Sequence, residues 1–229
     1  MLQVDKYHVA YGQSEVLHGL DFTVAPGEIV TIMGRNGMGK TTLMKSLMGI
    51  IPTRRGDAQV DGTNITDLKS FDRVAEGIAY VPQGRMIFPT MTVQENIETG
   101  LTLTGAKSVP EGIYELFPVL LEMKDRRGGN LSGGQQQQLA IARALATNPK
   151  VLLLDEPTEG IQPSIIREMA RVLKRIRDER GLSIIVSEQV LSFALDVADR
   201  ILVLENGRLV HDEPRASVNE ARVASFLSV

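Results

Sequence analysis

The strongest constraint on this chain is a glycine-rich segment with the spacing GxxxxGK[ST], which runs Gly34-Arg35-Asn36-Gly37-Met38-Gly39-Lys40-Thr41-Thr42. It follows the apolar run 28–33 and precedes residues 41–48, whose leucine and methionine spacings are helical. Between a strand and a helix, such a loop binds phosphate. Its glycines let backbone N–H groups point at phosphate oxygens, and the helix start adds the positive end of its dipole. The pattern predicts a nucleotide-binding strand–loop–helix unit.

Two carboxylates follow a second apolar run, Val151–Leu154, as Asp155 and Glu156. Ligands of open α/β sheets bind at the carboxyl ends of strands, where these side chains would lie. We predict that Lys40 reaches the β- and γ-phosphates and that Thr41 and Asp155 hold Mg²⁺. Glu156 is predicted to act as the general base on water. An acidic strand end is common by itself, but together with the phosphate loop it indicates nucleotide hydrolysis.

A second glycine-rich helix start is formed by Ser132, Gly133, Gly134 and Gln135. Ser132 is a good N-cap, and the two glycines allow close approach of a ligand to the backbone. One nucleotide needs only one such cradle. The segment therefore indicates either an ordinary loop-to-helix junction or a second phosphate site.

Strands that alternate with helices predict an α/β fold with a mostly parallel sheet. We expect buried strands at 28–33, 78–81, 151–154 and 183–186, and helices at 41–48, 132–146, 164–180 and 190–198. Antiparallel pairs are expected near both ends of the chain, as mixed edges of that sheet. They involve 2–10 with 16–24, the 56–65 hairpin at Asp61-Gly62, and 201–204 with 208–210 across Asn206-Gly207.

The stretch from about Val93 to Leu131 differs from the rest, because it contains helical fragments and few strand signals. We interpret residues 1–229 as a single domain. Residues 1–82 and 148–229 would form its α/β core, which includes an antiparallel β part, and residues 90–147 would form an inserted helical subdomain.

Composition excludes several classes of protein. Lys and Arg number 25 and Asp and Glu 28, so the net charge is 25 − 28 = −3, which argues against a nucleic-acid binder held by a basic surface. Cysteine is absent, which excludes disulfides and thiolate metal sites. No apolar run approaches the roughly 18 residues of a membrane span, and the N-terminus lacks a signal-peptide pattern. We expect a cytoplasmic protein that can still dock on a membrane protein.

The motifs together resemble one family. The phosphate loop, then LSGGQ followed by QQQLAIARAL, then VLLLDEPT, occur in the order and spacing typical of ATP-binding cassette ATPases. The resemblance extends over nearly the whole chain. It implies a P-loop core with an antiparallel β subdomain and a helical insertion, and ATP hydrolysis with Mg²⁺ that drives transmembrane transport.

Further site residues are implied by this resemblance. Tyr11 corresponds to an aromatic that stacks on adenine, and Gln83 to a glutamine that contacts Mg²⁺ and the water. Ser132–Gln135 match the signature that caps the γ-phosphate held by the other subunit. Gln189 stands where the family usually has a catalytic His, and Gln162 where it usually has an Asp. A glutamine amide donates a hydrogen bond but carries no positive charge.

The resemblance also implies partners. These are transmembrane permease subunits, a second ATPase subunit (self or paralogue) packed head to tail, and indirectly a solute-binding protein. The chain would then be a peripheral protein on the cytoplasmic face of the inner membrane.

Within the family, the Glu188-Gln189 pair in place of Thr-His is similar to the ATPases of urea and branched-chain amino acid importers. The runs 159–166 (EGIQPSII), 80–85 (YVPQGR) and 87–89 (IFP) favour the urea type, with branched-chain amino acids as the alternative.

Two rival functions stay open from the sequence. A cassette ATPase acting on DNA or ribosomes usually has two cassettes or a long inserted coiled coil, whereas Gln83 and Ser132 are only 132 − 83 = 49 residues apart. A nucleotide-switched regulator without turnover is disfavoured by the intact Glu156 but favoured by the missing His.

Overall fold

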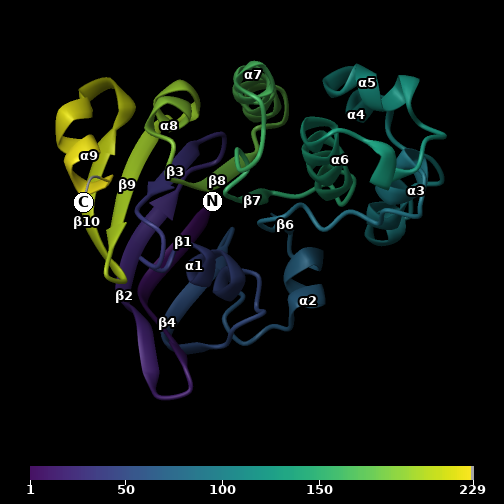
Figure 1. The fold of residues 1–229 in the computed structure, drawn as a ribbon. Coiled ribbons are helices and arrows are strands. Elements are labelled where there is room, and N and C mark those ends of the chain that lie inside the picture. Colours follow the sequence, from purple (N-terminus) through teal and green to yellow (C-terminus); the bar gives the residue numbers. More distant parts are fainter. Residues whose placement is uncertain (228–229) are drawn as a thin grey trace.

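Two β-sheets organise the chain in the computed structural model, which describes residues 1–227 (Figure 1). The smaller sheet is antiparallel, with strand order β2-β1-β4-β5. Its two longest strands, 2–11 and 14–24, alternate buried with more exposed residues over much of their length, as expected when one face packs on a core. The strands are β1 (Leu2–Tyr11), β2 (Ser14–Val24), β4 (Thr53–Val60) and β5 (Thr63–Asn64).

The larger sheet has the order β10-β9-β3-β8-β7-β6. Its five strands from β9 to β6 are parallel, and β10 is an antiparallel edge strand. Strands β3, β7 and β8 are buried along their whole length, as expected when both faces are covered. The strands are β3 (Ile29–Met33), β6 (Ile78–Val81), β7 (Val151–Asp155), β8 (Ser183–Glu188), β9 (Arg200–Glu205) and β10 (Arg208–Pro214).

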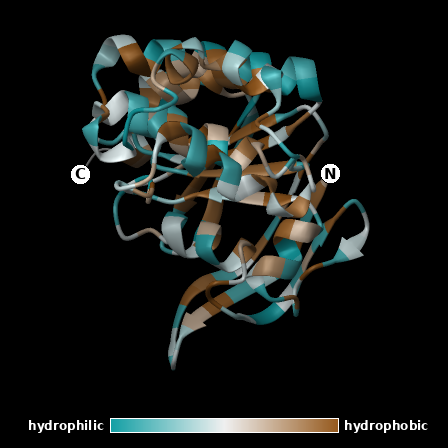
Figure 2. Ribbon diagram, turned by 90° about the vertical axis from the view of Figure 1, so that its right-hand side faces the viewer, coloured by the Kyte–Doolittle hydropathy of each residue, from teal (hydrophilic) through white to brown (hydrophobic). Residues whose placement is uncertain are grey.

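Helix α1 (Lys40–Leu47) lies between the two sheets and packs against strands of both. The period of two along β7 divides its side chains between two cores. Val151 and Leu153 join the core that contains α1, while Leu152 and Leu154 join the core on the opposite face. Figure 2 shows hydrophobic residues along the strands and hydrophilic residues on the outer helices. The phosphate loop is thus anchored between two packed layers.

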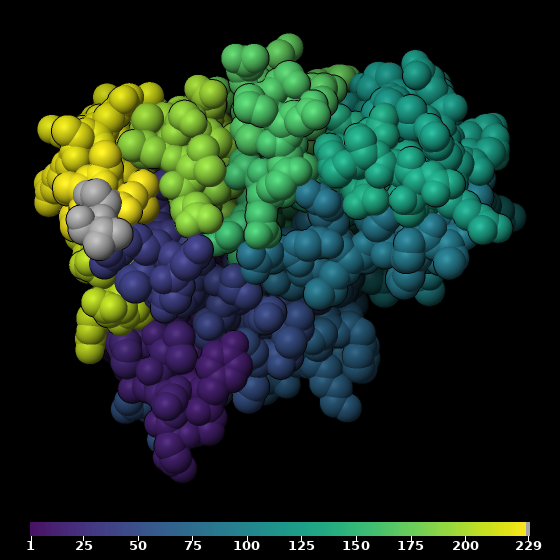
Figure 3. Space-filling model, viewed as in Figure 1, coloured from purple at the N-terminus to yellow at the C-terminus, as the bar shows by residue number. Residues whose placement is uncertain are grey.

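Helices α3 to α9 cover the second face and one end of the larger sheet, whereas α2 packs beside α1. Helices α3 to α6 form a group beside α7, seen as the teal region next to green α7 in Figure 3. Their bounds are α2 (Ser70–Ala75), α3 (Val93–Glu98), α4 (Glu111–Leu116), α5 (Pro118–Glu122), α6 (Gly133–Leu145), α7 (Pro163–Arg180), α8 (Leu191–Val197) and α9 (Glu220–Leu227), with 3-10 turns at Thr99–Leu103, Gly128–Asn130 and Arg215–Ser217.

Most expected elements are present, and the α/β fold class with its antiparallel part is confirmed. One expectation was wrong. The N-terminal pair β1 and β2 is not an edge of the parallel sheet but part of a separate sheet, because β1 pairs with β4 on its other side. Helix α2 was not expected from the sequence. The division into a core and a 90–147 subdomain stays a prediction.

Among residues 1–227, no helix combines the length and apolar character that crossing a membrane requires.

Candidate functional site

The phosphate loop connects the buried strand β3 to α1, and its glycines are dictated by geometry. Gly39 has a φ of 107°, a conformation that side chains rarely adopt, and a Cβ there would lie 2.8 Å from Leu17 Cδ2. A Cβ at Gly34 would lie 2.5 Å from the carbonyl oxygen of Leu204. The loop therefore packs its backbone directly against β2 and β9.

Helix α1 begins at this loop without a side-chain cap, since its N-cap residue is Gly39. The first backbone N–H groups of any helix lack partners within the helix. They are available to an anion here, and the helix dipole adds to their attraction.

Lys40 is 4% exposed, and its ammonium is held inside the loop. Its Nζ donates to the carbonyl oxygens of Gly34 at 2.6 Å and Arg35 at 3.1 Å. The same Nζ lies 3.2 Å from Oε1 of Glu156, which is 8% exposed. Two predicted site residues from distant parts of the sequence thus form a buried ion pair.

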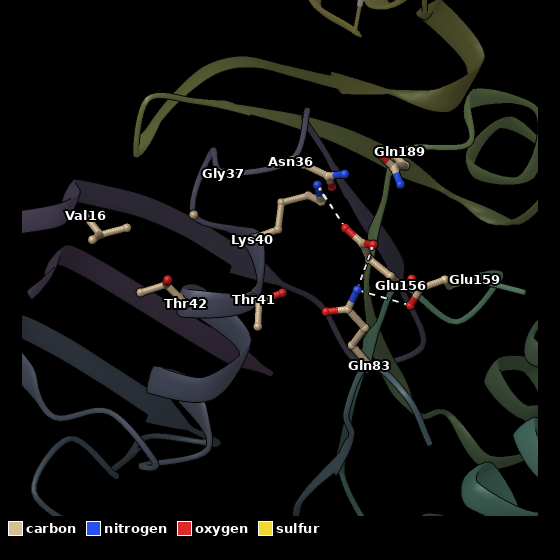
Figure 4. A pocket seen from close by; sticks show the side chains of 11 residues that line it. Val16, Asn36, Gly37, Lys40, Thr41, Thr42, Gln83, Glu156, Glu159 and Gln189 are labelled. Carbon is tan, nitrogen blue, oxygen red and sulfur yellow. Dashed lines mark hydrogen bonds and ion pairs between the residues drawn. The ribbon is translucent and has the colours of Figure 1, made fainter. Parts of the chain in front are cut away.

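A cavity of about 320 Å³ opens over these groups (Figure 4). It brings together the phosphate loop, the end of β7 and the segments that follow β6 and β8. The lining residues are Val16, Asn36, Gly37, Gly39, Lys40, Thr41, Thr42, Gln83, Glu156, Glu159 and Gln189. Of these, sequence analysis did not predict Val16 and Glu159 as site residues, although Glu159 begins the run 159–166.

Asp155 lies below the cavity with 1% exposure, and three hydroxyl groups donate to it. Thr41 Oγ1 and Ser187 Oγ donate to its Oδ1 at 3.2 and 2.5 Å. Tyr80 OH donates to Oδ2 at 3.2 Å. Burial and the neighbouring Asp155 charge raise the pKa of Tyr80, which keeps this phenol protonated as a donor. Sequence analysis missed Ser187 and Tyr80, which come from the adjacent strands β8 and β6.

Glu156 has a backbone φ of 46°, in the left-handed region. Such a conformation costs a non-glycine residue of the order of 1 kcal/mol and is often found at active sites. Its N–H donates to Ser187 O and Oγ, both at 3.1 Å. This anchoring turns the carboxylate toward Lys40 instead of continuing the strand.

Gln83 and Gln189 approach Glu156 from either side (Figure 4). Gln83 Nε2 donates to Glu156 Oε2 at 3.5 Å and to Glu159 Oε2 at 3.1 Å. Gln189 follows Glu188, which is 1% exposed and ends β8. Burial raises the pKa of Glu188, against the opposing effect of hydrogen bonds from Thr158 and two backbone amides.

The signature segment lies outside this cavity. Ser132 caps α6, with its Oγ accepting from Gln135 N at 3.3 Å while Gln135 Oε1 accepts from Ser132 N at 2.9 Å. Gly133 and Gly134 form the first turn of α6, and a Cβ at Gly134 would lie 2.8 Å from Ile165 Cγ2. Their predicted contact with a phosphate is therefore not made with the cavity of the same chain.

Four other predicted residues also lie outside the cavity lining, namely Tyr11, Gly34, Arg35 and Met38. Tyr11 ends β1 with 51% exposure. Arg35 contributes its carbonyl oxygen to Lys40, and Met38 Sδ accepts from Asn206 N at 3.3 Å. Their predicted nucleotide contacts stay predictions.

A model of the ABC transporter family matches residues 17–159, which include the phosphate loop, the signature segment and the Asp155-Glu156 pair. The chain belongs to the ABC transporter family. As a member it is an ATPase that binds ATP. The chain is 40% identical to the high-affinity branched-chain amino acid transport ATP-binding protein BraG of Pseudomonas aeruginosa, over 97% of each chain. It is 32% identical to the lipopolysaccharide export system ATP-binding protein LptB of Escherichia coli, over 93% of this chain and 91% of LptB.

Solved structures of ABC transporter cassettes share the fold of this chain. The ADP conformation of MJ1267, an ATP-binding cassette of an ABC transporter, superposes with a TM-score of 0.83 at 26% identity, covering 99% of this chain and 94% of that one. The dimeric structure of MJ0796, a bacterial ABC transporter cassette, gives a TM-score of 0.83 at 26% identity and covers 94% of this chain and 99% of that one. These relatives confirm the predicted family and ATPase activity. They do not specifically support urea as cargo.

Proposed function

We propose that this chain is the ATP-hydrolysing subunit of an importer for a small polar solute, with branched-chain amino acids as the cargo. The observation that carries the ATPase part is the single cavity that contains Lys40, Thr41, Glu156 and Gln189. The cargo rests on BraG, which is similar over almost the full length of both chains. Urea, which the run 159–166 favours, is the alternative cargo.

The triphosphate would lie along the loop at the start of α1. Backbone N–H groups and the Lys40 ammonium would bind its oxygens, so Lys40 would exchange its contacts with loop carbonyls for phosphate. Tyr11, half exposed at the end of β1, would contact the adenine ring. The bulk of the binding energy would come from the phosphates, because the lining of the cavity is mostly polar.

Mg²⁺ suits the donors that are present. Thr41, Asp155 and Gln83 offer a hydroxyl, a carboxylate and an amide oxygen, and Mg²⁺ is typically held by one or two carboxylates, water and substrate phosphates. When bound, the ion neutralises charge that develops on the phosphate oxygens. Ser187 and Tyr80 would act as positioning residues that hold the Asp155 carboxylate in place.

Catalysis would depend on Glu156 as general base. Lys40 Nζ lies 3.2 Å from Glu156 Oε1, so binding of the triphosphate would draw Lys40 toward the phosphates and leave the carboxylate to accept a proton from water. Gln83 and Gln189 would orient that water through their amides. Positioning of water and phosphate would supply most of the rate enhancement.

A second ATPase subunit would complete the site. The cavity of the same chain is not lined by Ser132, Gly133, Gly134 or Gln135, so these residues would reach the γ-phosphate held by a partner packed head to tail. An accepting serine hydroxyl still has its own proton to donate to a phosphate. The dimeric structure of the cassette MJ0796 supports the association of two such subunits. ATP would then stabilise the dimer and hydrolysis would release it.

The permease would dock in an apolar groove of about 590 Å³ between α1, α2 and α6. Its lining includes Met48, Ile50 and Met86 together with the cations Lys45 and Arg143, and no acidic residue among the described part of the chain lines it. A short amphipathic segment with an acidic residue would complement it. This docking would place the chain peripherally at the cytoplasmic face of the inner membrane, with a solute-binding protein acting from the other side.

The function is tested first with Glu156→Gln in the purified chain. The variant should bind ATP as wild type does but release phosphate at least about 100-fold more slowly, because the base is lost while the shape is kept. Glu159→Gln, in the same cavity, is the matched control and should retain turnover. Near-normal turnover of Glu156→Gln would contradict the proposed role.

The cargo is tested by uptake. Deletion of the gene in its own organism should abolish high-affinity uptake of labelled leucine, and expression of the wild-type chain should restore it. Loss of urea uptake with normal leucine uptake would favour the alternative cargo. Normal uptake of both solutes would contradict import of either.

The docking surface is tested with Met86→Glu, which places a charge in the groove. This variant should bind ATP normally but fail to co-purify with membrane permease subunits. Leu103→Glu, which alters a similarly exposed apolar residue outside the groove, should co-purify.

A further inference from the structure

Glu188 is a buried carboxylate that no part of the proposed mechanism uses. It is the last residue of β8 and is 1% exposed. A buried carboxylate is costly unless its oxygens accept hydrogen bonds. Both carboxylate oxygens of Glu188 accept hydrogen bonds, and the partners of the two oxygens indicate a role beyond stability.

The two oxygens of Glu188 bind two different loops. Oε1 accepts from the backbone N–H of Gln189 at 2.8 Å and of Val190 at 3.1 Å. Oε2 accepts from Thr158 Oγ1 at 2.7 Å. The first oxygen thus fixes the backbone that presents Gln189 to the cavity, and the second holds the loop that follows Glu156.

Thr158 is itself buried, at 5% exposure, and lies within the turn after the proposed base. Glu159 N donates to Glu156 O at 3.2 Å, and Ile161 N donates to Thr158 O at 3.1 Å. A shift of Thr158 would therefore move the turn that contains Glu156 and Glu159. Both Glu156 and Gln189 line the cavity, but in this structure no hydrogen bond between these two side chains is present among the described residues.

We propose that Glu188 is a positioning residue that couples Gln189 to the Glu156 turn through Thr158. This coupling holds the side chains of Gln189 and Glu156 in place so that both contact the attacking water. The inference rests on the proposed function of this cavity. A hydrogen bond to a charged oxygen is stronger than one between neutral groups, which makes the link between the two loops stiff. Gln189, lacking the charge of a histidine, depends on its position alone.

The test uses steady-state phosphate release by the purified full chain, with kcat and KM for ATP measured separately. Thr158→Val keeps the shape but removes the hydroxyl, and Thr158→Ser keeps the hydroxyl as the matched control. We expect Thr158→Val to lower kcat about tenfold with KM within about twofold of wild type, because the link acts on the reacting water and not on ATP binding. Thr158→Ser should retain nearly full kcat.

Two Glu188 variants complete the experiment. Glu188→Ala should lower kcat at least as much as Thr158→Val, and Glu188→Gln should restore it to within about threefold of wild type, since its Oε1 still accepts from the two amides and its nitrogen donates to Thr158. The double variant Glu188→Ala with Thr158→Val should have a kcat no lower than that of Glu188→Ala alone, because both substitutions break the same link between the two loops.

Unchanged kcat in Thr158→Val, or multiplicative losses in the double variant, would overturn the proposal. A lower melting temperature with normal kcat per folded molecule would also overturn it and leave Glu188 with a purely structural role. Glu156→Gln, measured alongside, separates this failure from failure of the proposed function. If Glu156→Gln turns over normally, the site itself is misassigned, whereas an inactive Glu156→Gln with a normal Thr158→Val rejects only the coupling.

Discussion

The chain contains two helix starts that follow glycine-rich segments, and they differ in how their first N–H groups are satisfied. Helix α1 begins after Gly39 with no side-chain cap and faces the cavity. Helix α6 begins after Ser132, whose capping box with Gln135 satisfies donors of its own first turn. The comparison teaches that glycine content alone does not decide how a helix start would meet a phosphate. The uncapped start of α1 leaves its N–H groups for a ligand in the cavity of its own chain, whereas the start of α6 satisfies its own donors and lies outside that cavity, so its proposed phosphate contact requires a partner chain.

The largest expected effect concerns the cation at the open helix start. Lys40→Ala should weaken ATP binding by about 100-fold or more, because it removes the charge that contacts the phosphates and leaves Glu156 buried without its ion pair. Isothermal titration with ATP measures this. Lys45→Ala, on the same helix but outside the cavity, should bind ATP like wild type. Equal ATP affinities of Lys40→Ala and Lys45→Ala would contradict the assignment of the phosphate site to the start of α1.

The next effect concerns the backbone of the open helix start. Gly39→Ala should destabilise the protein by about 1–3 kcal/mol, because its φ of 107° and the 2.8 Å approach to Leu17 leave no room for a Cβ. Gly37→Ala is the matched control. Its φ is also positive, at 83°, but no atom lies within 4 Å of its added Cβ, so the loss should be smaller. Urea unfolding measures both, and a larger loss in Gly37→Ala would contradict this account.

The capped helix start is tested by two substitutions of one residue. Ser132→Ala should cost about 1 kcal/mol of stability because the cap is lost. Ser132→Asp should keep the cap, since aspartate is a good N-cap, yet it would set a carboxylate against the phosphate of a partner. It should therefore be as stable as wild type but lose ATP-dependent dimerisation in light scattering. Normal ATP-dependent dimerisation of Ser132→Asp would contradict the proposed contact of this segment with the nucleotide of a partner.

The smallest effect concerns pH. The pKa of Glu188 is raised above its ordinary value of 4.5, chiefly by burial. The folded state therefore binds this proton more tightly than the unfolded state, and its contribution to stability is present below pH 4.5 and is lost as pH rises through the folded-state pKa. The unfolding free energy of wild type relative to Glu188→Gln should fall over this range. A rising difference, measured by urea unfolding at several pH values, would contradict the direction of the shift.

The sequence made the motif-bearing elements predictable because their signals are local. The apolar run before Gly34, the run before Asp155 and the Ser132 cap each specify their own strand or helix start. Helix α2 was missed because its only fully buried side chain is Arg73, whose guanidinium donates to four backbone carbonyls. An arginine gives no apolar periodicity, so no sequence pattern indicates this helix.

The sequence by itself determined the family, the ATPase chemistry and the identity of the phosphate loop, because those depend on residue types at fixed spacing. The tertiary structure decided which residues meet. Strand order places Ser187 and Tyr80 on either side of Asp155, brings Lys40 to Glu156, and joins Glu188 to Thr158. The physical reason is that pairing of β7 with β6 and β8 joins segments far apart in the chain, and local sequence signals carry no information about which strands become neighbours.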